Sequence, residues 1–144
     1  MKPKGLCLPP HEVLMQVPFH DLDPMQIVWH GNYLKYFDTA RESLFRSLGV
    51  DLYDFFRETG YLFPVIRSTV KYIEPLRYHD TFTCSATLME ITHKLVVDFE
   101  IRRTGTHTIC TKGRGEQAAV KHPEMELCFE IPEIFRQRLQ LKTP

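Results

Sequence analysis

The spacing of apolar residues predicts one strand and one long helix in the first fifty residues. Apolar and polar side chains alternate from Val13 to Phe19, as in a strand with one buried face. A helix is expected from Tyr33 onward, because apolar residues then recur at helical spacing. The residues that share the face of Tyr33 are Tyr36, Phe37, Ala40, Leu44 and Leu48. Gly49 follows them and is expected to cap the end of the helix.

A short helix is predicted at 51–58, closed by Gly60. After it, apolar and polar residues alternate with a period of two. Alternation then predicts strands over 63–73, 81–88, 95–102 and roughly 107–120, and a short helix over 131–141. Gly113 and Gly115 fall on one face of the last strand. Glycine weakens a strand, so we expect a helix or a ligand to approach the backbone closely there.

The order of the predicted elements indicates an α+β fold. One long helix and a mostly antiparallel sheet, with four consecutive strands in meander-like succession, can cover each other's apolar faces. We therefore expect residues 1–10 to form a flexible leader and residues 11–144 to form a single domain. The free edges of such a sheet favour pairing with a second copy.

Composition excludes several classes of protein. The net charge is zero, so no global basic field attracts nucleic acid or an anionic membrane. No apolar run approaches the roughly 20 residues of a membrane-spanning helix, and no apolar region follows the basic N-terminal residues as in a secretory signal. The four cysteines are scattered and include no Cys-x-x-Cys pair, which argues against a zinc site and favours reduced thiols in the cytoplasm. We expect no metal and no separate cofactor.

Candidate chemistry lies just before the long helix, where Asp21 and Asp23 occupy a short loop. A carboxylate near the free N–H groups of a helix start can supply an attacking or base group together with donors for a developing oxyanion. An aspartate in this place is also commonly a cap or turn former, and that interpretation stays open for Asp23. Asp21 is expected to hold the loop by hydrogen bonds to backbone N–H groups. Neither aspartate has the ligand spacing to a histidine that a metal site requires.

The motif resembles a known family. The run Asp21-Leu22-Asp23-Pro24-Met25-Gln26-Ile27-Val28-Trp29-His30-Gly31-Asn32-Tyr33, followed by Phe37-Asp38-Thr39-Ala40-Arg41, resembles the hotdog-fold acyl-CoA thioesterases. Within them it is most similar to the 4-hydroxybenzoyl-CoA thioesterase branch, which includes the Tol-Pal-associated short-chain thioesterases. The likeness covers roughly residues 12–140. It implies a long central helix wrapped by a five-stranded antiparallel sheet, assembled as a homodimer or homotetramer with active sites between subunits.

The resemblance also implies roles for particular residues. Asp23 takes the place of the catalytic carboxylate, and the backbone N–H of His30, with Gly31 adjacent, takes that of the oxyanion donor. Two further aromatic residues are expected to form core or pocket wall, Trp29 and Tyr33. The basic residues considered for the phosphates of coenzyme A or of a carrier protein's pantetheine include Lys71 and Arg77.

These expectations predict a thioesterase that converts acyl-CoA or acyl-carrier-protein thioesters to free acid and thiol, with coenzyme A as part of the substrate. A thiol pKa of about 8.5 makes the thiolate a fair leaving group without an added acid. Two alternatives stay open. A 3-hydroxyacyl-thioester hydratase or dehydratase of the same fold needs an acid and a base across the Cα–Cβ bond, and the His-Phe-Pro type of motif is absent. A non-enzymatic acyl-CoA-binding protein would bind without turnover.

Overall fold

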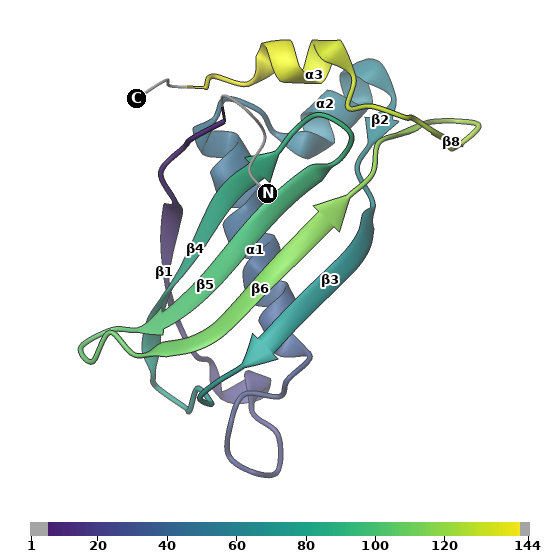
Figure 1. The fold of residues 1–144 in the computed structure, drawn as a ribbon. Helices are drawn as coiled ribbons and strands as arrows, with labels where there is room; N and C mark the ends of the chain where they lie inside the picture. The colour runs from purple at the N-terminus through teal and green to yellow at the C-terminus, as the bar shows by residue number, and fades with distance from the viewer. Residues whose placement is uncertain (1–5, 142–144) are drawn as a thin grey trace.

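The alternating segments form one five-stranded antiparallel sheet in the computed structural model, which describes residues 6–141 (Figure 1). Its strands are β1 (His11–Gln16), β3 (Val65–Tyr72), β4 (Thr81–Glu90), β5 (Leu95–Arg103) and β6 (Ile109–Gln117). Their order across the sheet is β1-β4-β5-β6-β3. The predicted five-stranded antiparallel sheet is therefore confirmed.

The predicted succession of four meander strands is wrong in one respect. Only β4, β5 and β6 follow one another in the sheet, whereas β3 pairs with β6 at the edge. The connection from β3 to β4, residues 73–80, is longer than the two to five residues of a hairpin loop. It carries the chain from one edge of the sheet to β4 on the other side of β5 and β6, as Figure 1 shows.

The long helix α1 (Asn32–Ser47) lies across the concave face of this sheet (Figure 1). Phe37 of α1 stacks on Phe99 of β5, with 4.5 Å between the ring centroids. A Cβ atom at Gly113 would overlap the Phe37 ring, and one at Gly115 would lie 2.5 Å from the guanidinium of Arg41. The expectation that a helix approaches the backbone at the two glycines is thus confirmed.

Helix ends follow the predicted signals. Gly49, with a φ of 90°, follows Leu48, the residue that caps the end of α1. Helix α2 (Leu52–Thr59) begins after Asp51, whose side chain accepts the N–H of Asp54 at 3.0 Å, and ends at Gly60 with a φ of 83°. Helix α3 (Glu133–Arg138) is shorter than the predicted 131–141. Phe135 of α3 packs against Phe45, Phe55 and Phe63, which closes one end of the core.

Three strands of two residues each form a small second sheet that the sequence did not predict. They are β2 (Tyr61–Leu62), β7 (Val120–Lys121) and β8 (Glu126–Leu127). Two residues are too few to show an alternating pattern, so no periodic signal marks such strands.

The start of the chain departs from the predicted strand. β1 ends at Gln16, and Phe19 instead begins a 3-10 turn, η1 (Phe19–Asp21), where its side chain is exposed. Pro18 lacks a backbone donor and stands between the two elements. Within the predicted leader, residues 1–5 lie outside the described residues, and residues 6–10 have no regular structure although Leu6 joins the core.

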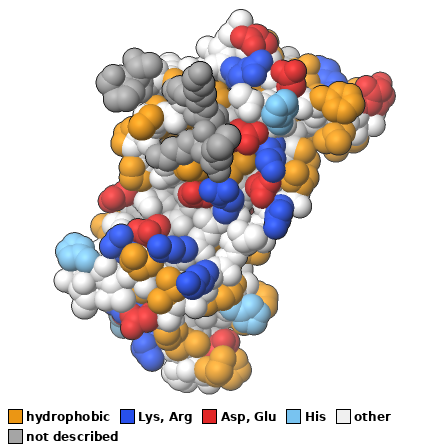
Figure 2. Space-filling view, viewed as in Figure 1, with side chains coloured by type: hydrophobic (Ala, Val, Ile, Leu, Met, Phe, Trp, Pro, Cys, Tyr) orange, Lys and Arg blue, Asp and Glu red, His pale blue; other side chains and the backbone are white. Residues whose placement is uncertain are grey.

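The face of the sheet turned away from α1 is polar. Figure 2 shows basic and acidic side chains interspersed over it. Several of these charges pair across or along the strands, as Arg114 does with Asp98 at 2.6 Å. Between residues 6 and 141, no helix is long and apolar enough to cross a membrane.

Candidate active site

Asp23 begins a tight loop between η1 and α1. Its backbone N–H donates to the Ile27 carbonyl at 2.9 Å, and its carboxylate Oδ1 accepts the N–H of Met25 at 2.8 Å. Gln26 completes the turn with a φ of 67° and donates its N–H to the Asp23 carbonyl. Asp23 therefore does form a turn, as the alternative interpretation allowed. Its second oxygen, Oδ2, takes part in no hydrogen bond among residues 6–141.

The loop is tied to the segment that follows β3. Val28 donates its N–H to the Leu76 carbonyl at 2.9 Å, and Ile27 forms an isolated antiparallel bridge with Arg77. Residues some fifty positions apart are thus joined by backbone pairing. This pairing sets the loop of Asp23 beside the end of β3.

Asp21 supports the loop from inside the protein. Its side chain is only 1% exposed and accepts hydrogen bonds from Lys35 Nζ and the Tyr36 hydroxyl, each at 2.6 Å. Burial alone would raise the pKa of Asp21, but the hydrogen bonds from Lys35 and Tyr36 outweigh it and hold that pKa below its ordinary value. Burial and the bond to Asp21 raise the pKa of Tyr36. The structural role expected for Asp21 is present, with side chains in place of the expected backbone N–H partners.

Asp23, His30 and Tyr33 line one cavity of about 270 Å³. Most of its wall is apolar or aromatic, and the remaining lining residues are Met25, Ile27, Val28, Tyr72, Ile73, Glu74 and Pro75. The cavity lies where the loop of Asp23, the start of α1 and the end of β3 meet. A carboxylate at the edge of an apolar cavity is an arrangement suited to a substrate with a reactive polar group on a hydrocarbon body.

Two backbone N–H groups at the start of α1 have no acceptor within the described part of the chain, those of His30 and Gly31. Such free donors are normal in the first turn of a helix. Each of these N–H groups shares a peptide unit with the carbonyl of the preceding residue, and both carbonyl groups accept a hydrogen bond. Trp29 O accepts the N–H of Asn32, and His30 O accepts the Tyr72 hydroxyl, each at 2.9 Å.

The predicted aromatic residues take different places. Tyr33 is buried at the cavity and its hydroxyl accepts the N–H of Leu76 at 3.2 Å, while burial raises the pKa of this tyrosine. Trp29 is half-exposed and its ring covers Gly31, so closely that a Cβ atom there would overlap it. Trp29 therefore packs over the start of α1. It is not among the residues that line the cavity.

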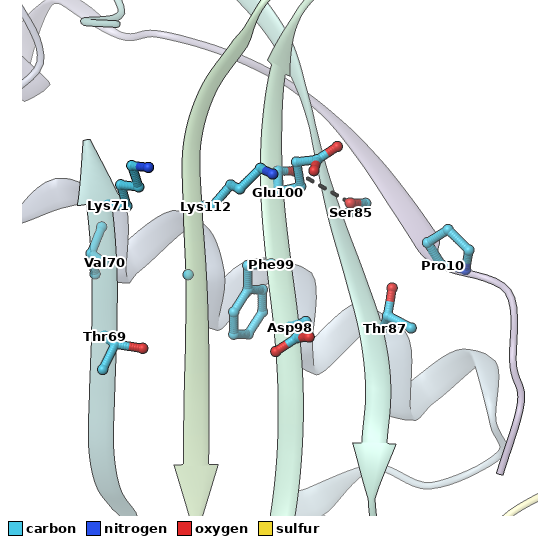
Figure 3. Close-up of a pocket in the computed structure, with 11 residues that line it drawn as sticks. Pro10, Thr69, Val70, Lys71, Ser85, Thr87, Asp98, Phe99, Glu100 and Lys112 are labelled. Carbon is cyan, nitrogen blue, oxygen red and sulfur yellow. Dashed lines mark hydrogen bonds between the residues drawn. The ribbon is translucent and has the colours of Figure 1, made fainter. Parts of the chain in front are cut away.

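Lys71 and Arg77 are not brought to the cavity of Asp23. Side chains alternate along a strand, so Lys71 lies on the opposite face from its neighbour Tyr72. It lines a larger cavity of about 620 Å³ on the polar face of the sheet, opposite Lys112 in register (Figure 3). Arg77 belongs to an exposed turn in which its backbone N–H donates to Asp80 Oδ2 at 2.8 Å.

Tyr72, Ile73, Glu74 and Pro75 contribute a cavity wall that the sequence analysis did not predict. The sequence predicts a strand that ends at residue 73, but no pattern indicates which segment lies beside the residues that follow it. Only the pairing of Ile27 with Arg77 and of Val28 with Leu76 shows that this segment adjoins the loop of Asp23. No group of three or more His, Cys, Asp or Glu side chains in the described structure is arranged to hold a metal ion.

Comparison with known proteins identifies the family. A model of the thioesterase superfamily matches residues 25–113, which include the start of α1, and the chain belongs to that superfamily. The predicted enzyme class, a thioester hydrolase, is thereby confirmed. A 1,4-dihydroxy-2-naphthoyl-CoA hydrolase from Thermosynechococcus vestitus is 26% identical over 128 residues, or 89% of this chain and 80% of that protein.

Solved structures share the fold. A 1,4-dihydroxy-2-naphthoyl-CoA (DHNA-CoA) thioesterase from Staphylococcus aureus superposes with a TM-score of 0.78 at 21% identity, over 83% of this chain and 80% of that one. A 4-hydroxybenzoyl-CoA thioesterase mutant, complexed with 4-hydroxybenzoyl-CoA, superposes with a TM-score of 0.79 at 18% identity, over 90% and 98% of the two chains. At these identities the likeness is one of architecture.

Proposed function

We propose that this protein hydrolyses acyl-CoA thioesters to a free acid and coenzyme A in the cavity of Asp23. One observation carries the proposal: a single apolar cavity brings together Asp23 and His30, and within residues 6–141 neither Asp23 Oδ2 nor the His30 N–H at the start of α1 has a hydrogen-bond partner. The Thermosynechococcus vestitus relative, which by its name hydrolyses an aromatic acyl-CoA, supports this substrate class. An acyl-carrier-protein thioester presents the same reacting group and is the second substrate to test.

In the proposed reaction the thioester carbonyl oxygen accepts hydrogen bonds from the N–H groups of His30 and Gly31. Asp23 Oδ2 then acts in one of two ways. As a nucleophile it attacks the carbonyl carbon, the C–S bond breaks, the thiolate leaves, and water hydrolyses the mixed anhydride to restore the carboxylate. As a base it removes a proton from the water that attacks the same carbon. Either route consumes one water and gives one acid and one thiol.

A second copy of the chain is part of the proposal. β3 has a free edge in the described sheet, and its outer residues Val65, Ile66 and Tyr72 are exposed together with the adjacent Ile73. Tyr72 and Ile73 also line the cavity. A partner strand along β3 would therefore add a wall to the cavity as well as satisfy the edge. We propose a homodimer, or a tetramer built from such dimers.

Replacement of the carboxylate tests the proposal. Asp23→Asn keeps an oxygen that can accept the Met25 N–H, so the loop is retained while the negative charge is lost. We expect kcat to fall by at least about 10³ with KM nearly unchanged, the pattern of lost transition-state stabilisation. Asp54→Asn, at an exposed position in α2, is the matched control and should retain full activity. Equal turnover by Asp23→Asn and the unaltered protein would refute the mechanism.

A panel of substrates defines the acyl group and separates the alternatives. Release of thiol would be measured with benzoyl-, 1,4-dihydroxy-2-naphthoyl-, butyryl- and palmitoyl-CoA, and with the corresponding acyl-carrier-protein thioesters. Hydration of crotonyl-CoA without release of thiol would favour a hydratase. Saturable binding of every acyl-CoA without turnover would favour a binding protein.

A further inference from the structure

We infer that Tyr72 is a positioning residue for the oxyanion-binding amides, acting through its hydrogen bond to the His30 carbonyl. The inference rests on the proposed function, because it concerns the donors that bind the thioester oxygen. It adds a residue from the sheet to a donor site that otherwise belongs to the start of α1.

The contact joins two elements that are distant in the sequence. Tyr72 is the last residue of β3, and its hydroxyl donates to His30 O at 2.9 Å across 42 positions of the chain. The carbonyl of His30 and the N–H of Gly31 belong to one planar peptide unit and point in opposite directions. Fixing the carbonyl therefore also fixes the direction in which the Gly31 N–H points.

The peptide unit between Trp29 and His30 is also held by a hydrogen bond to its carbonyl. The carbonyl of Trp29 accepts the N–H of Asn32 at 2.9 Å, which fixes the unit that carries the His30 N–H. The N–H groups of His30 and Gly31 are thus oriented by the hydrogen bonds that the carbonyl groups of their own peptide units accept. The bond to Trp29 is internal to the helix start, whereas the bond to His30 depends on a side chain from another element.

The hydrogen bond from Tyr72 to the His30 carbonyl also makes the Gly31 N–H a stronger donor. A hydrogen bond received by a carbonyl polarises its peptide group, and estimates of such cooperative strengthening are about 10–30% per bond. The chain of groups runs from the Tyr72 O–H through the His30 carbonyl to the Gly31 N–H. A thioester oxygen that gains negative charge would be the terminal acceptor of this chain.

The ring of Tyr72 is held independently of its hydroxyl. It packs edge-on against Tyr33, with 5.3 Å between centroids, and against the His30 ring at 6.3 Å. Tyr72→Phe can therefore remove the hydroxyl while the aromatic contacts remain. Because the side chain is 49% exposed, loss of this one hydroxyl should leave the stability of the fold nearly unchanged.

The test is a kinetic comparison of Tyr72→Phe with the unaltered protein, using the acyl-CoA from the panel that is hydrolysed fastest. We expect kcat to fall about 3- to 10-fold, with KM and the melting temperature unchanged. Tyr53→Phe removes an exposed hydroxyl from α2 and is the matched control, expected to retain full kcat. An unchanged kcat, or a loss confined to KM, would overturn the inference.

The pH profile separates positioning from direct proton transfer. A hydroxyl that only holds the His30 carbonyl does not exchange a proton with the substrate, so Tyr72→Phe should lower the profile without changing its shape. Loss of one limb of the profile would mean that Tyr72 itself is the acid or base, which contradicts a positioning role.

A spectroscopic measurement tests the oxyanion donors without relying on the rate of turnover. Benzoyl-CoA labelled with ¹³C at the carbonyl would be bound to Asp23→Asn, which turns over slowly, and to Asp23→Asn combined with Tyr72→Phe. We expect the infrared carbonyl stretch to lie at lower frequency in the first complex, because stronger hydrogen bonds polarise the C=O bond. Identical frequencies would reject the role of Tyr72. Full activity of Asp23→Asn would reject the role proposed for Asp23, whereas the kinetic comparison of Tyr72→Phe would still test the oxyanion donors.

Discussion

Two aspartates separated by one residue have opposite surroundings in this chain. Asp21 is buried and hydrogen-bonded to two side chains, whereas Asp23 lies at a cavity, and one of its oxygens has no hydrogen-bond partner within residues 6–141. The first arrangement stabilises the ionised carboxylate within the fold, whereas the second is the one that we propose acts on a substrate. Substitution at these two positions should therefore affect different properties of the protein.

Asp21 should make the stability of the protein dependent on pH. Its pKa in the folded state lies below the ordinary value of 3.8, so folding favours the ionised form. This stabilisation is complete above that ordinary value and is lost as the pH falls through the folded pKa. We expect Asp21→Asn to lower the free energy of unfolding at pH 7 by about 1.5–3 kcal/mol, the range for hydrogen bonds to a charged group.

Urea unfolding of both proteins between pH 7 and pH 3 measures this effect. The difference between them should be constant at neutral pH and shrink as the pH falls below about 4. Tyr36→Phe removes one of the two donors and serves as the companion variant. A difference that is the same at all pH values would show that the charge of Asp21 does not stabilise the fold.

At the scale of single residues, the sequence identified the loop but not its opposite wall. Asp23, His30 and Tyr33 form a local motif, and they do meet at one cavity. Tyr72 and Glu74 lie some forty positions away and reach that cavity only through the pairing of Val28 with Leu76. No periodic signal specifies such a contact between an irregular loop and the end of a strand.

At the scale of elements, the close packing of α1 on β6 depends on Gly113. A methyl group there would overlap the Phe37 ring and lie 3.1 Å from the Thr69 carbonyl, and Phe37 is already stacked on Phe99. We expect Gly113→Ala to lower the free energy of unfolding by about 1–3 kcal/mol, the usual cost of overpacking a core. Chemical denaturation of the purified variant measures this value.

Gly115 provides the comparison for that prediction. A methyl group at Gly115 meets the end of the Arg41 side chain, which can shift more easily than a stacked ring or a backbone carbonyl. Gly115→Ala should therefore destabilise the protein less than Gly113→Ala. The reverse order would mean that α1 can move away from β6 more readily than Arg41 can reorient.

Elements with a sustained period were predicted, and short or non-local features were not. Apolar residues at helical spacing from Tyr33 to Leu48 predicted α1, and alternation predicted the five long strands. The edge position of β3 follows from pairing between residues far apart, such as Val70 with Gly113, and so has no local pattern. The predicted strand extended too far at Phe19 because alternation continues past the point where Pro18 interrupts the backbone pairing.

At the scale of the whole molecule, the two edges of the sheet allow a direct test of the proposed dimer. Ile66 on β3 is 59% exposed and Leu14 on β1 is 70% exposed. We expect Ile66→Glu to weaken pairing along β3, because it places charges where two strands would meet. Light scattering after size-exclusion chromatography should then give the mass of a monomer, together with reduced thioesterase activity.

Leu14→Glu places the same charge on the other edge and should leave both mass and activity unchanged. If Leu14→Glu dissociates the assembly and Ile66→Glu does not, then β1 is the edge that pairs and the cavity at the end of β3 is complete in one chain.

The positions of the four cysteines have a practical consequence for measuring turnover. Cys84 and Cys110 are buried, and burial raises the pKa of Cys84 to about 12, so neither should react with a disulfide dye such as Ellman's reagent. Cys7 is exposed and Cys128 is half-buried, and neither lines the cavity of Asp23. The dye that reports newly freed coenzyme A can therefore stay in the cuvette throughout, with a background of at most two equivalents per chain and no attack on residues that line the cavity of Asp23.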